Sequence, residues 1–336
     1  MAKFYKILFF NILILSSLIA ISSYSWFSMW LGLEINLLSI IPLFNSNKNY
    51  FPSEAALKYY VTQSMASTII LFSVLNMSNS KEMILSTDYF NQIIFNSSIF
   101  IKMGAAPFHF WFPEISEGLN WVSNLILLTW QKLAPFSIIS YVIENSSFFI
   151  LVILSSLMIG GFLGMNQVSL RKILTFSSIN HIGWMLSSML ISNSFWMVYF
   201  LIYTFISITL IWGFKNWNTF YLHQMFNFNN TEKSVNLMFF LMFLSLGGLP
   251  PFLGFFPKWI TIYGLVTYNL SLLSILMIIL TLLTLFYYLR SIFMFTTLVS
   301  SETILQKSKL NKMTISVLNN LNLTSLLLIP LLFNFI

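Results

Sequence analysis

Apolar runs follow one another along nearly the whole chain, and short polar segments separate them. A helix needs about 20 mostly apolar residues to cross a hydrocarbon core of roughly 30 Å. Counted in this way, the pattern predicts about eleven membrane-spanning helices. We therefore expect an all-α polytopic membrane protein. The expected spans are 4–22, 25–44, 56–76, 90–117, 122–143, 148–165, 173–191, 194–216, 235–268, 270–296 and 314–335.

Two of these apolar runs are interrupted by the same local pattern. Gly, Pro, Phe, Phe and Pro recur in register in Gly104–Glu114 and Gly248–Lys258, 144 positions apart. Proline lacks an amide hydrogen and clashes with the preceding turn, so a helix broken near Pro107 or Pro250/Pro251 leaves unpaired backbone groups at membrane depth. Such groups are tolerated only where they line a cavity, and paired broken helices therefore point to an ion site in a transporter. The alternative is that Pro and Gly merely kink these helices.

The basic residues indicate how the spans are oriented. With the spans counted above, ten of the lysines and arginines fall on one side of the membrane, and only Lys81 falls on the other. This asymmetry is what the positive-inside rule predicts. We therefore expect the N-terminus on the electrically negative side of the membrane and the C-terminus on the opposite side.

The same spans divide into two similar units. Residues 1–145 and 146–297 each hold five expected helices, and the broken helix is the fourth in each unit. Because five is odd, the units enter the membrane from opposite sides, which predicts an inverted repeat. Residues 298–336 add a basic loop and a C-terminal membrane helix. The loop at 301–312 either contacts a partner or anionic lipid, or is simply a solvated loop that sets topology.

Composition narrows the chemistry. The chain has 57% hydrophobic and 7% charged residues, whereas soluble domains contain roughly 25% charged residues. It has no cysteine, which excludes disulfides, iron–sulfur clusters and thiolate metal sites. Three histidines cannot supply two bis-histidine haems, and the nine carboxylates are dispersed. We expect no redox cofactor on this chain, and its net charge of +7 is better explained by membrane topology than by nucleic acid.

Four charged residues lie inside apolar runs: Glu34, Lys102, Lys132 and Lys258. A charge near the bilayer centre costs at least roughly 2.5–3.5 kcal/mol, so these residues are functional candidates. Desolvation favours the neutral form of an amine, and a nearby opposite charge favours the ionised form, so a glutamate with several lysines makes a set of coupled proton sites. The alternative is a structural ion pair or a lysine that extends to the interface. That alternative is weakest for Glu34 and Lys132, which lie near the middle of their spans.

The remaining titratable residues are weaker candidates. His181 lies mid-span, where a near-neutral pKa suits a proton relay, but a lone histidine equally often makes a hydrogen bond between helices. The residues near span ends are expected to be interfacial anchors or peripheral. These are Lys58, Glu114, Glu117, Lys215 and His223.

Several motifs resemble a known family. They are Trp30-Leu-Gly-Leu-Glu34-Ile-Asn36-Leu, Lys102–Pro113, Trp130-Gln-Lys132, Ser177–His181 and Gly247–Trp259. Across nearly its whole length, the chain is similar to the subunit 2 family of mitochondrial respiratory complex I, NADH:ubiquinone oxidoreductase, in its animal and arthropod form. That family belongs to the antiporter-like subunits shared with multisubunit cation/proton antiporters.

The resemblance implies a role in coupling NADH oxidation by ubiquinone to proton translocation across the mitochondrial inner membrane. It implies that Glu34 pairs with Lys102 at one end of a hydrated axis, that Lys132 is the central relay, and that Lys258 lies toward the exit or the next subunit. FMN, iron–sulfur clusters, NADH and ubiquinone are then expected in the assembly. The expected partners are other membrane-arm subunits, including antiporter-like ones, and phospholipids such as cardiolipin, but no nucleic acid. The alternatives are a sodium/proton antiporter and a passive membrane scaffold.

Overall fold

The computed structural model describes residues 4–45, 50–79, 85–143, 147–224, 233–250 and 252–296. Within these ranges helices are joined by turns and short loops, and the extended pairing is limited to an isolated bridge between Ser169 and Tyr221. The expected all-α fold is therefore confirmed for this part of the chain. Pro251, the basic loop and the expected span 314–335 lie outside the described residues.

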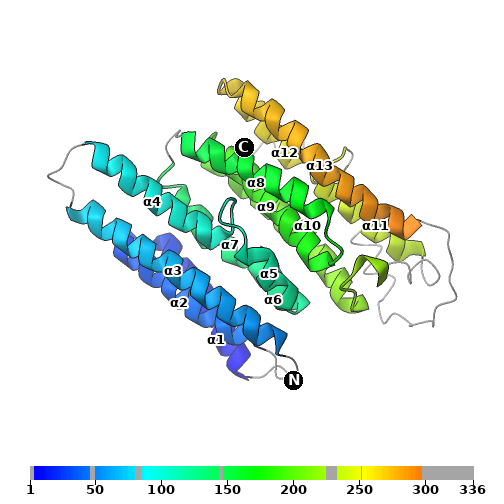
Figure 1. Cartoon of the computed structure of the whole chain (residues 1–336), viewed down its shortest axis with the longest axis horizontal. Helices are drawn as coiled ribbons and strands as arrows, with labels where there is room; N and C mark the ends of the chain where they lie inside the picture. The colour runs from blue at the N-terminus through cyan, green and yellow to red at the C-terminus, as the bar shows by residue number, and fades with distance from the viewer. Residues whose placement is uncertain are drawn as a thin grey trace. The chain divides into compact units, whose positions relative to one another are not determined.

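The helices follow the apolar runs closely, and Figure 1 shows their order along the chain. They are α1 (Phe4–Ser22), α2 (Trp26–Phe44), α3 (Phe51–Asn79), α4 (Leu85–Met103), α5 (Trp111–Gly118), α6 (Trp121–Leu128), α7 (Trp130–Ile139), α8 (Ser147–Met165), α9 (Leu170–Met189), α10 (Asn193–Trp217), α11 (Lys233–Gly247), α12 (Phe255–Thr267) and α13 (Ser271–Thr296).

Six segments of the described chain are long and apolar enough to cross a membrane by length and composition alone. Helices α5, α11 and α12, which flank the breaks, have 8, 15 and 13 residues and do not meet that length by themselves. The full number of crossings therefore stays a prediction. These six segments are Phe4–Ser22, Trp26–Phe44, Trp121–Ile139, Ser147–Met165, Asn193–Trp217 and Ser271–Phe293.

The chain divides into two compact units, of which the first is Met1–Val152. In this unit α2 packs between α1 and α3, α3 packs against α4 and α5, and α7 contacts α1 and α4. Close packing of α1 on α2 depends on Gly32, because a Cβ there would lie 2.8 Å from the backbone nitrogen of Ala20. Small residues allow this approach between membrane helices.

The second unit begins at Ile153, and its described part ends at residue 296. Here α9 is the central helix, because every residue from Ile173 to Met189 is buried. It packs against α10, α12 and α13, and α11 packs against α10 and α13. Serine and threonine hydroxyls of α9 donate to carbonyls of their own helix, as Ser177 does to Leu174 at 2.8 Å. Such local bonds satisfy polar groups inside an apolar bundle.

Both expected helix breaks are present, and they share one backbone motif. Gly104 after α4 and Gly248 after α11 have φ angles of +73° and +72°. Each glycine N–H bonds to the carbonyl three residues before it, at 3.1 and 3.0 Å. The N–H of the next residue bonds to the carbonyl five residues before that residue, at 3.0 and 3.3 Å. This is the Schellman arrangement, in which glycine adopts the left-handed conformation that ends a helix. The helix therefore ends at a glycine three residues before Pro107, and not at the proline.

One further interruption differs from the expectation of a continuous span over 122–143. The helix stops at Leu128 and resumes at Trp130, and Thr129 between them has φ −113° and ψ −72°. The Thr129 hydroxyl donates to the carbonyl of Leu125 at 2.7 Å, a bond that commonly bends helices. Pro135 lies inside α7 and has no amide hydrogen to donate to the carbonyl of Gln131. The apolar pattern carries no sign of this interruption.

Candidate functional site

Lys102 lies in the last turn of α4 and is only 7% exposed. The regular helical hydrogen bonding ends at the break that follows it, and side chains of neighbouring helices bond to two backbone carbonyls there. Trp111 Nε1 donates to the carbonyl of Ile101 at 3.0 Å, and Gln63 Nε2 reaches the carbonyl of Lys102 at 3.5 Å. The lysine is thus held at a helix end whose backbone is tied to α3 and α5.

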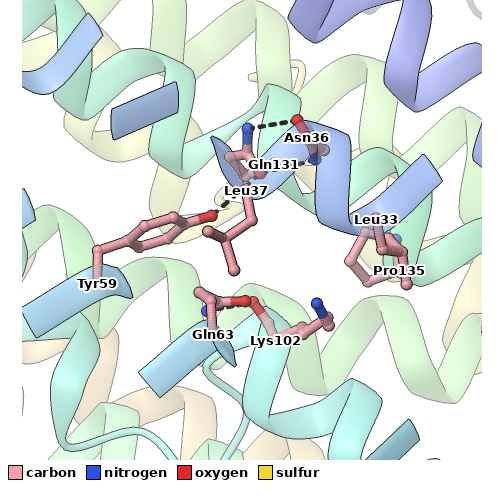
Figure 2. Close-up of a pocket in the computed structure, with 8 residues that line it drawn as sticks. All are labelled: Leu33, Asn36, Leu37, Tyr59, Gln63, Lys102, Gln131 and Pro135. Atoms are coloured by element: carbon pink, nitrogen blue, oxygen red, sulfur yellow. Dashed lines mark hydrogen bonds between the residues drawn. The ribbon is translucent and has the colours of Figure 1, made fainter. Parts of the chain in front are cut away.

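A small polar cavity opens beside Lys102, and Figure 2 shows the side chains around it. Its volume is about 10 Å³, which is the lower limit of the room that one water molecule needs. Five of its eight lining side chains carry polar groups. The lining residues are Leu33, Asn36, Leu37, Tyr59, Gln63, Lys102, Gln131 and Pro135.

Glu34 lies in α2 and is partly buried. Its carboxylate interacts electrostatically with the Lys102 amine. In the described part of the chain the two groups form no salt bridge within 4.0 Å. The structure therefore brings Glu34 and Lys102 within range of each other's charge, without a direct contact.

Lys132 lies in α7 and is 1% exposed. Its amine is 5.5 Å from the centre of the Phe112 ring in α5, a distance at which the negative face of an aromatic ring attracts a cation. Phe112 also packs closely on Gly104, because a Cβ on this glycine would lie 3.0 Å from the Phe112 ring. The first helix break thus places an aromatic ring against the most buried of the candidate lysines.

Lys258 occupies the corresponding place after the second break, at the start of α12. Its amine donates a hydrogen bond of 2.8 Å to the carbonyl of Gly247, the last residue of α11. The same amine lies 5.7 Å from the ring centre of Trp184 in α9. With 7% exposure, Lys258 is a buried cation that caps a helix end, where the helix dipole is negative.

His181 lies in α9 of the same unit, and α9 packs against α12. Its Nδ1 shares a hydrogen bond of 2.9 Å with the hydroxyl of Tyr199 in α10, and the Tyr203 ring lies 5.1 Å away between centres. The sequence allowed either a proton relay or a hydrogen bond between helices for His181, and this hydrogen bond is present. A histidine in such a bond keeps the capacity to exchange a proton, so the relay role stays a prediction.

The family of the chain follows from comparison with known proteins. The model of the family described as NADH:quinone oxidoreductase/Mrp antiporter, TM, matches residues 23–284, which is well over half of the chain. The chain belongs to the NADH:quinone oxidoreductase/Mrp antiporter family. With its long apolar helices, this family member is a multi-pass membrane protein.

Relatives of this antiporter-family chain carry a more specific name. NADH-ubiquinone oxidoreductase chain 2 of Anopheles gambiae is 48% identical over 300 residues, which cover 88% of this chain and 87% of that protein. NADH-ubiquinone oxidoreductase chain 2 of Aedes aegypti is 47% identical over 339 residues, which cover 99% of this chain and 99% of that protein. A chain of respiratory complex I from Thermus thermophilus with bound aureothin shares the fold, with a TM-score of 0.86, 20% identity, and coverage of 98% of this chain and 80% of that one.

The residues expected at the periphery of this antiporter-family chain do form surface contacts. Lys58 bridges Glu54 at 3.1 Å and Glu114 at 3.2 Å, and all three side chains are about half exposed or more. Exposed ion pairs contribute about 0–1 kcal/mol. Lys215 and His223 are exposed. These groups are therefore better suited to anchoring helix ends than to the buried chemistry.

Sequence reasoning did not single out every polar residue of the site. Asn36 and Tyr59 both bond to Gln131 beside the cavity, and Tyr199 bonds to His181. The sequence did hold a weak signal for two of them, because both amides lie inside apolar runs. Asn36 is two residues after Glu34, and Gln131 directly precedes Lys132. Tyr59 and Tyr199 gave no comparable signal, since tyrosines are frequent in this sequence and common in membrane helices.

Proposed function

We propose that this chain is a core membrane-arm subunit of mitochondrial NADH:ubiquinone oxidoreductase, respiratory complex I, and that it couples electron transfer to proton translocation. The observation that carries the proposal is the set of three lysines, Lys102, Lys132 and Lys258, each more than nine-tenths buried in apolar helices. Buried amines are costly, and two of them flank breaks that are repeated in the sequence. The family and the named relatives support the same function.

Within this proposal each titratable group has one role. Glu34 and Lys102 form an interacting pair at the entry end of the path, since their charges interact. Lys132 is the central relay, because it is the most buried lysine of the set. His181 passes protons within the second half, and Lys258 releases them toward the exit or the next subunit. A change of charge at one site alters the proton affinity of its neighbours.

The proposal includes the arrangement in the membrane. It has about eleven crossings, with residues 1–145 and 146–297 as inverted five-helix repeats, and residues 298–336 as a basic loop and a last helix. The shared Schellman motif after α4 and α11 supports two related units. In the mitochondrial inner membrane the N-terminus then faces the matrix and the C-terminus the intermembrane space, as the basic residues indicate.

The redox chemistry belongs to other subunits of the proposed assembly. The sequence has no cysteine and hence no thiolate for an iron–sulfur cluster, so FMN, iron–sulfur clusters, NADH and ubiquinone are assigned elsewhere in the complex. Further antiporter-like subunits and phospholipids such as cardiolipin are the proposed neighbours in the membrane. This chain contributes to the enzyme as a proton-translocating subunit without a redox centre of its own.

The energy scale suits such a role. Moving one proton against about 180 mV costs about 4 kcal/mol, at roughly 2.3 kcal/mol per 100 mV. The buried titratable side chains interact through a medium of low dielectric constant. A change of charge on one of them can therefore alter the energy of another by several kcal/mol. Electron transfer therefore needs to alter only one charge at the end of the row to drive the next transfer.

A second candidate is cation/proton antiport without NADH oxidation, because the family description also includes Mrp antiporters. Purification of the native assembly through this chain separates the two functions. The proposal predicts co-purification of flavin and iron–sulfur signals, with NADH oxidation that acidifies one side of the membrane. An assembly without these signals that exchanges sodium for protons would contradict it.

A further inference from the structure

Asn36 of α2 and Gln131 of α7 form a reciprocal amide pair. Asn36 Nδ2 donates to Gln131 Oε1 at 3.0 Å, and Gln131 Nε2 donates to Asn36 Oδ1 at 3.1 Å. The hydroxyl of Tyr59 in α3 also donates to Gln131 Oε1, at 3.2 Å. All three side chains are buried, and Figure 2 shows them meeting at Gln131. Three helices are therefore joined through one amide.

Helix α7 needs such a constraint more than a long helix would. It has ten residues, and the interruption at Thr129 separates it from α6. Pro135 lacks the N–H that would bond to the carbonyl of Gln131, four residues earlier. The interruption at Thr129 and the hydrogen bond missing at Pro135 weaken the helical bonding of this segment, so contacts of its side chains contribute to the rotation of α7 about its axis.

The rotation of α7 decides where Lys132 lies. Successive residues of an α-helix point about 100° apart around the axis. With Gln131 bonded to α2, the next side chain, Lys132, reaches α5 and lies 5.5 Å from the Phe112 ring centre. Loss of the amide pair would allow α7 to turn and would move the Lys132 amine away from this position.

The same amides also face the cavity beside Lys102. Each amide nitrogen has a second N–H, and Asn36 Oδ1 has a second lone pair. The Gln131 carbonyl lacks its helical donor because of Pro135. Asn36 and Gln131 line the cavity together with Gln63 and Lys102, and these residues offer a water there the two to four polar partners that a buried water requires.

We infer that Asn36, Gln131 and Tyr59 form a positioning element for the proton path. The element holds Lys132 at a fixed orientation and binds one water between Lys102 and the Gln131 end of α7. This inference rests on the proposed function, because it assigns these residues to the transfer between Lys102 and Lys132. The three side chains do not themselves gain or lose a proton; they act through Lys132 and the water.

Variants of the intact complex in proteoliposomes test the element. Gln131→Leu and Asn36→Leu each remove both hydrogen bonds of the pair, and we expect the rate of proton translocation to fall about threefold to tenfold. Tyr59→Phe removes one hydroxyl at nearly constant volume, so it is the variant to use where an amide variant does not assemble, and it should cause a smaller loss. Tyr60→Phe is the matched control, because Tyr60 is 45% exposed and should pump normally.

Rescue distinguishes positioning from general packing. The exchange Asn36→Gln with Gln131→Asn keeps two amides and the total number of methylene groups, so the double variant should recover most of the pumping that each single exchange loses. In a Lys132→Met background, Gln131→Leu should cause no further loss, because it acts through Lys132. A double exchange as poor as the worse single exchange would overturn the inference.

The outcomes separate this inference from the proposed function. Normal pumping by Gln131→Leu together with loss of pumping in Lys132→Met overturns only the inference. Normal pumping by Lys132→Met overturns the proposed function and the inference with it. A density map of the complex that resolves ordered waters should show one bonded to Asn36 or Gln131 in this cavity, and a dry cavity would contradict the water-binding part.

Discussion

The amine of Lys258 bonds directly to the carbonyl of Gly247, across the break between α11 and α12. A side chain proposed to carry protons thus also completes the hydrogen bonding of a broken helix. The bond places a positive charge at the negative end of the α11 dipole. Charge at Lys258 and the geometry of the break are therefore linked through one contact of 2.8 Å.

Replacing Lys258 by Met should disturb both properties. The Gly247 carbonyl loses its donor, and an unsatisfied buried acceptor costs about 1–3 kcal/mol. We expect proton translocation to fall and amides around the break to exchange faster with deuterium. Lys215→Met is the control, because Lys215 is exposed near the end of α10. Unchanged exchange at the break in Lys258→Met would show that this hydrogen bond is dispensable.

Gly248→Ala should destabilise the second break. The left-handed conformation costs a residue with a Cβ about 1–2 kcal/mol, and the Cβ would lie 2.7 Å from Lys258 Cδ. Gly247→Ala provides a neighbouring control, since its nearest contact would be an ordinary 3.6 Å to Tyr288. Thermal unfolding of the purified complex should register a lower midpoint for Gly248→Ala than for Gly247→Ala. Equal midpoints would contradict the assigned role of the glycine.

The two breaks show how far sequence reasoning reaches. Gly and Pro in register predicted where two apolar runs are interrupted, and the interruptions are there. The sequence predicted breaks near Pro107 and Pro250/Pro251, whereas the positive φ of Gly104 and Gly248 ends both helices. Pro251 lies outside the described residues. A proline signals that a helix cannot continue, but the position of its end depends on which residue tolerates the left-handed conformation.

The polar network beside Lys102 was beyond such reasoning. Asn36 and Gln131 are 95 positions apart, and apolar periodicity contains no information on which buried amides meet. The interruption at Thr129 was missed for a related reason, because its cause is a local side-chain bond within an unbroken apolar run. The candidate charges were easier to find, since a lysine inside an apolar helix is conspicuous by its cost.

Glu34 and Lys102 should behave as a coupled pair in a double-mutant cycle. Glu34→Gln leaves the Lys102 charge without its partner, and Lys102→Met does the converse. We expect each single change to slow proton translocation and the double change to be milder than the worse single change. Removing one partner of a buried salt bridge typically costs about 3–5 kcal/mol. Because Glu34 and Lys102 make no direct salt bridge, their coupling energy should be smaller than this. Strictly additive losses would mean that the residues are independent.

His181 should lose function without loss of assembly. Replacement of His181 by Gln removes the titratable ring but keeps polar atoms for Tyr199, so we expect slower pumping in a complex of normal abundance. Tyr199→Phe removes only the partner hydroxyl, 2.9 Å away, and should have a smaller effect. His223→Gln, at an exposed histidine, serves as the control. Normal pumping by His181→Gln would reduce this residue to a hydrogen bond between helices.

The proton-to-electron ratio of complex I carrying Lys132→Met is the most direct test of the role proposed for Lys132. Methionine keeps much of the side-chain volume and removes the amine, and an apolar residue is easier to bury there, so the complex should assemble and oxidise NADH. We predict that it moves fewer protons per electron than the unmodified complex in the same proteoliposomes. An unchanged ratio in the fully assembled variant would contradict the proposal that this chain translocates protons through Lys132.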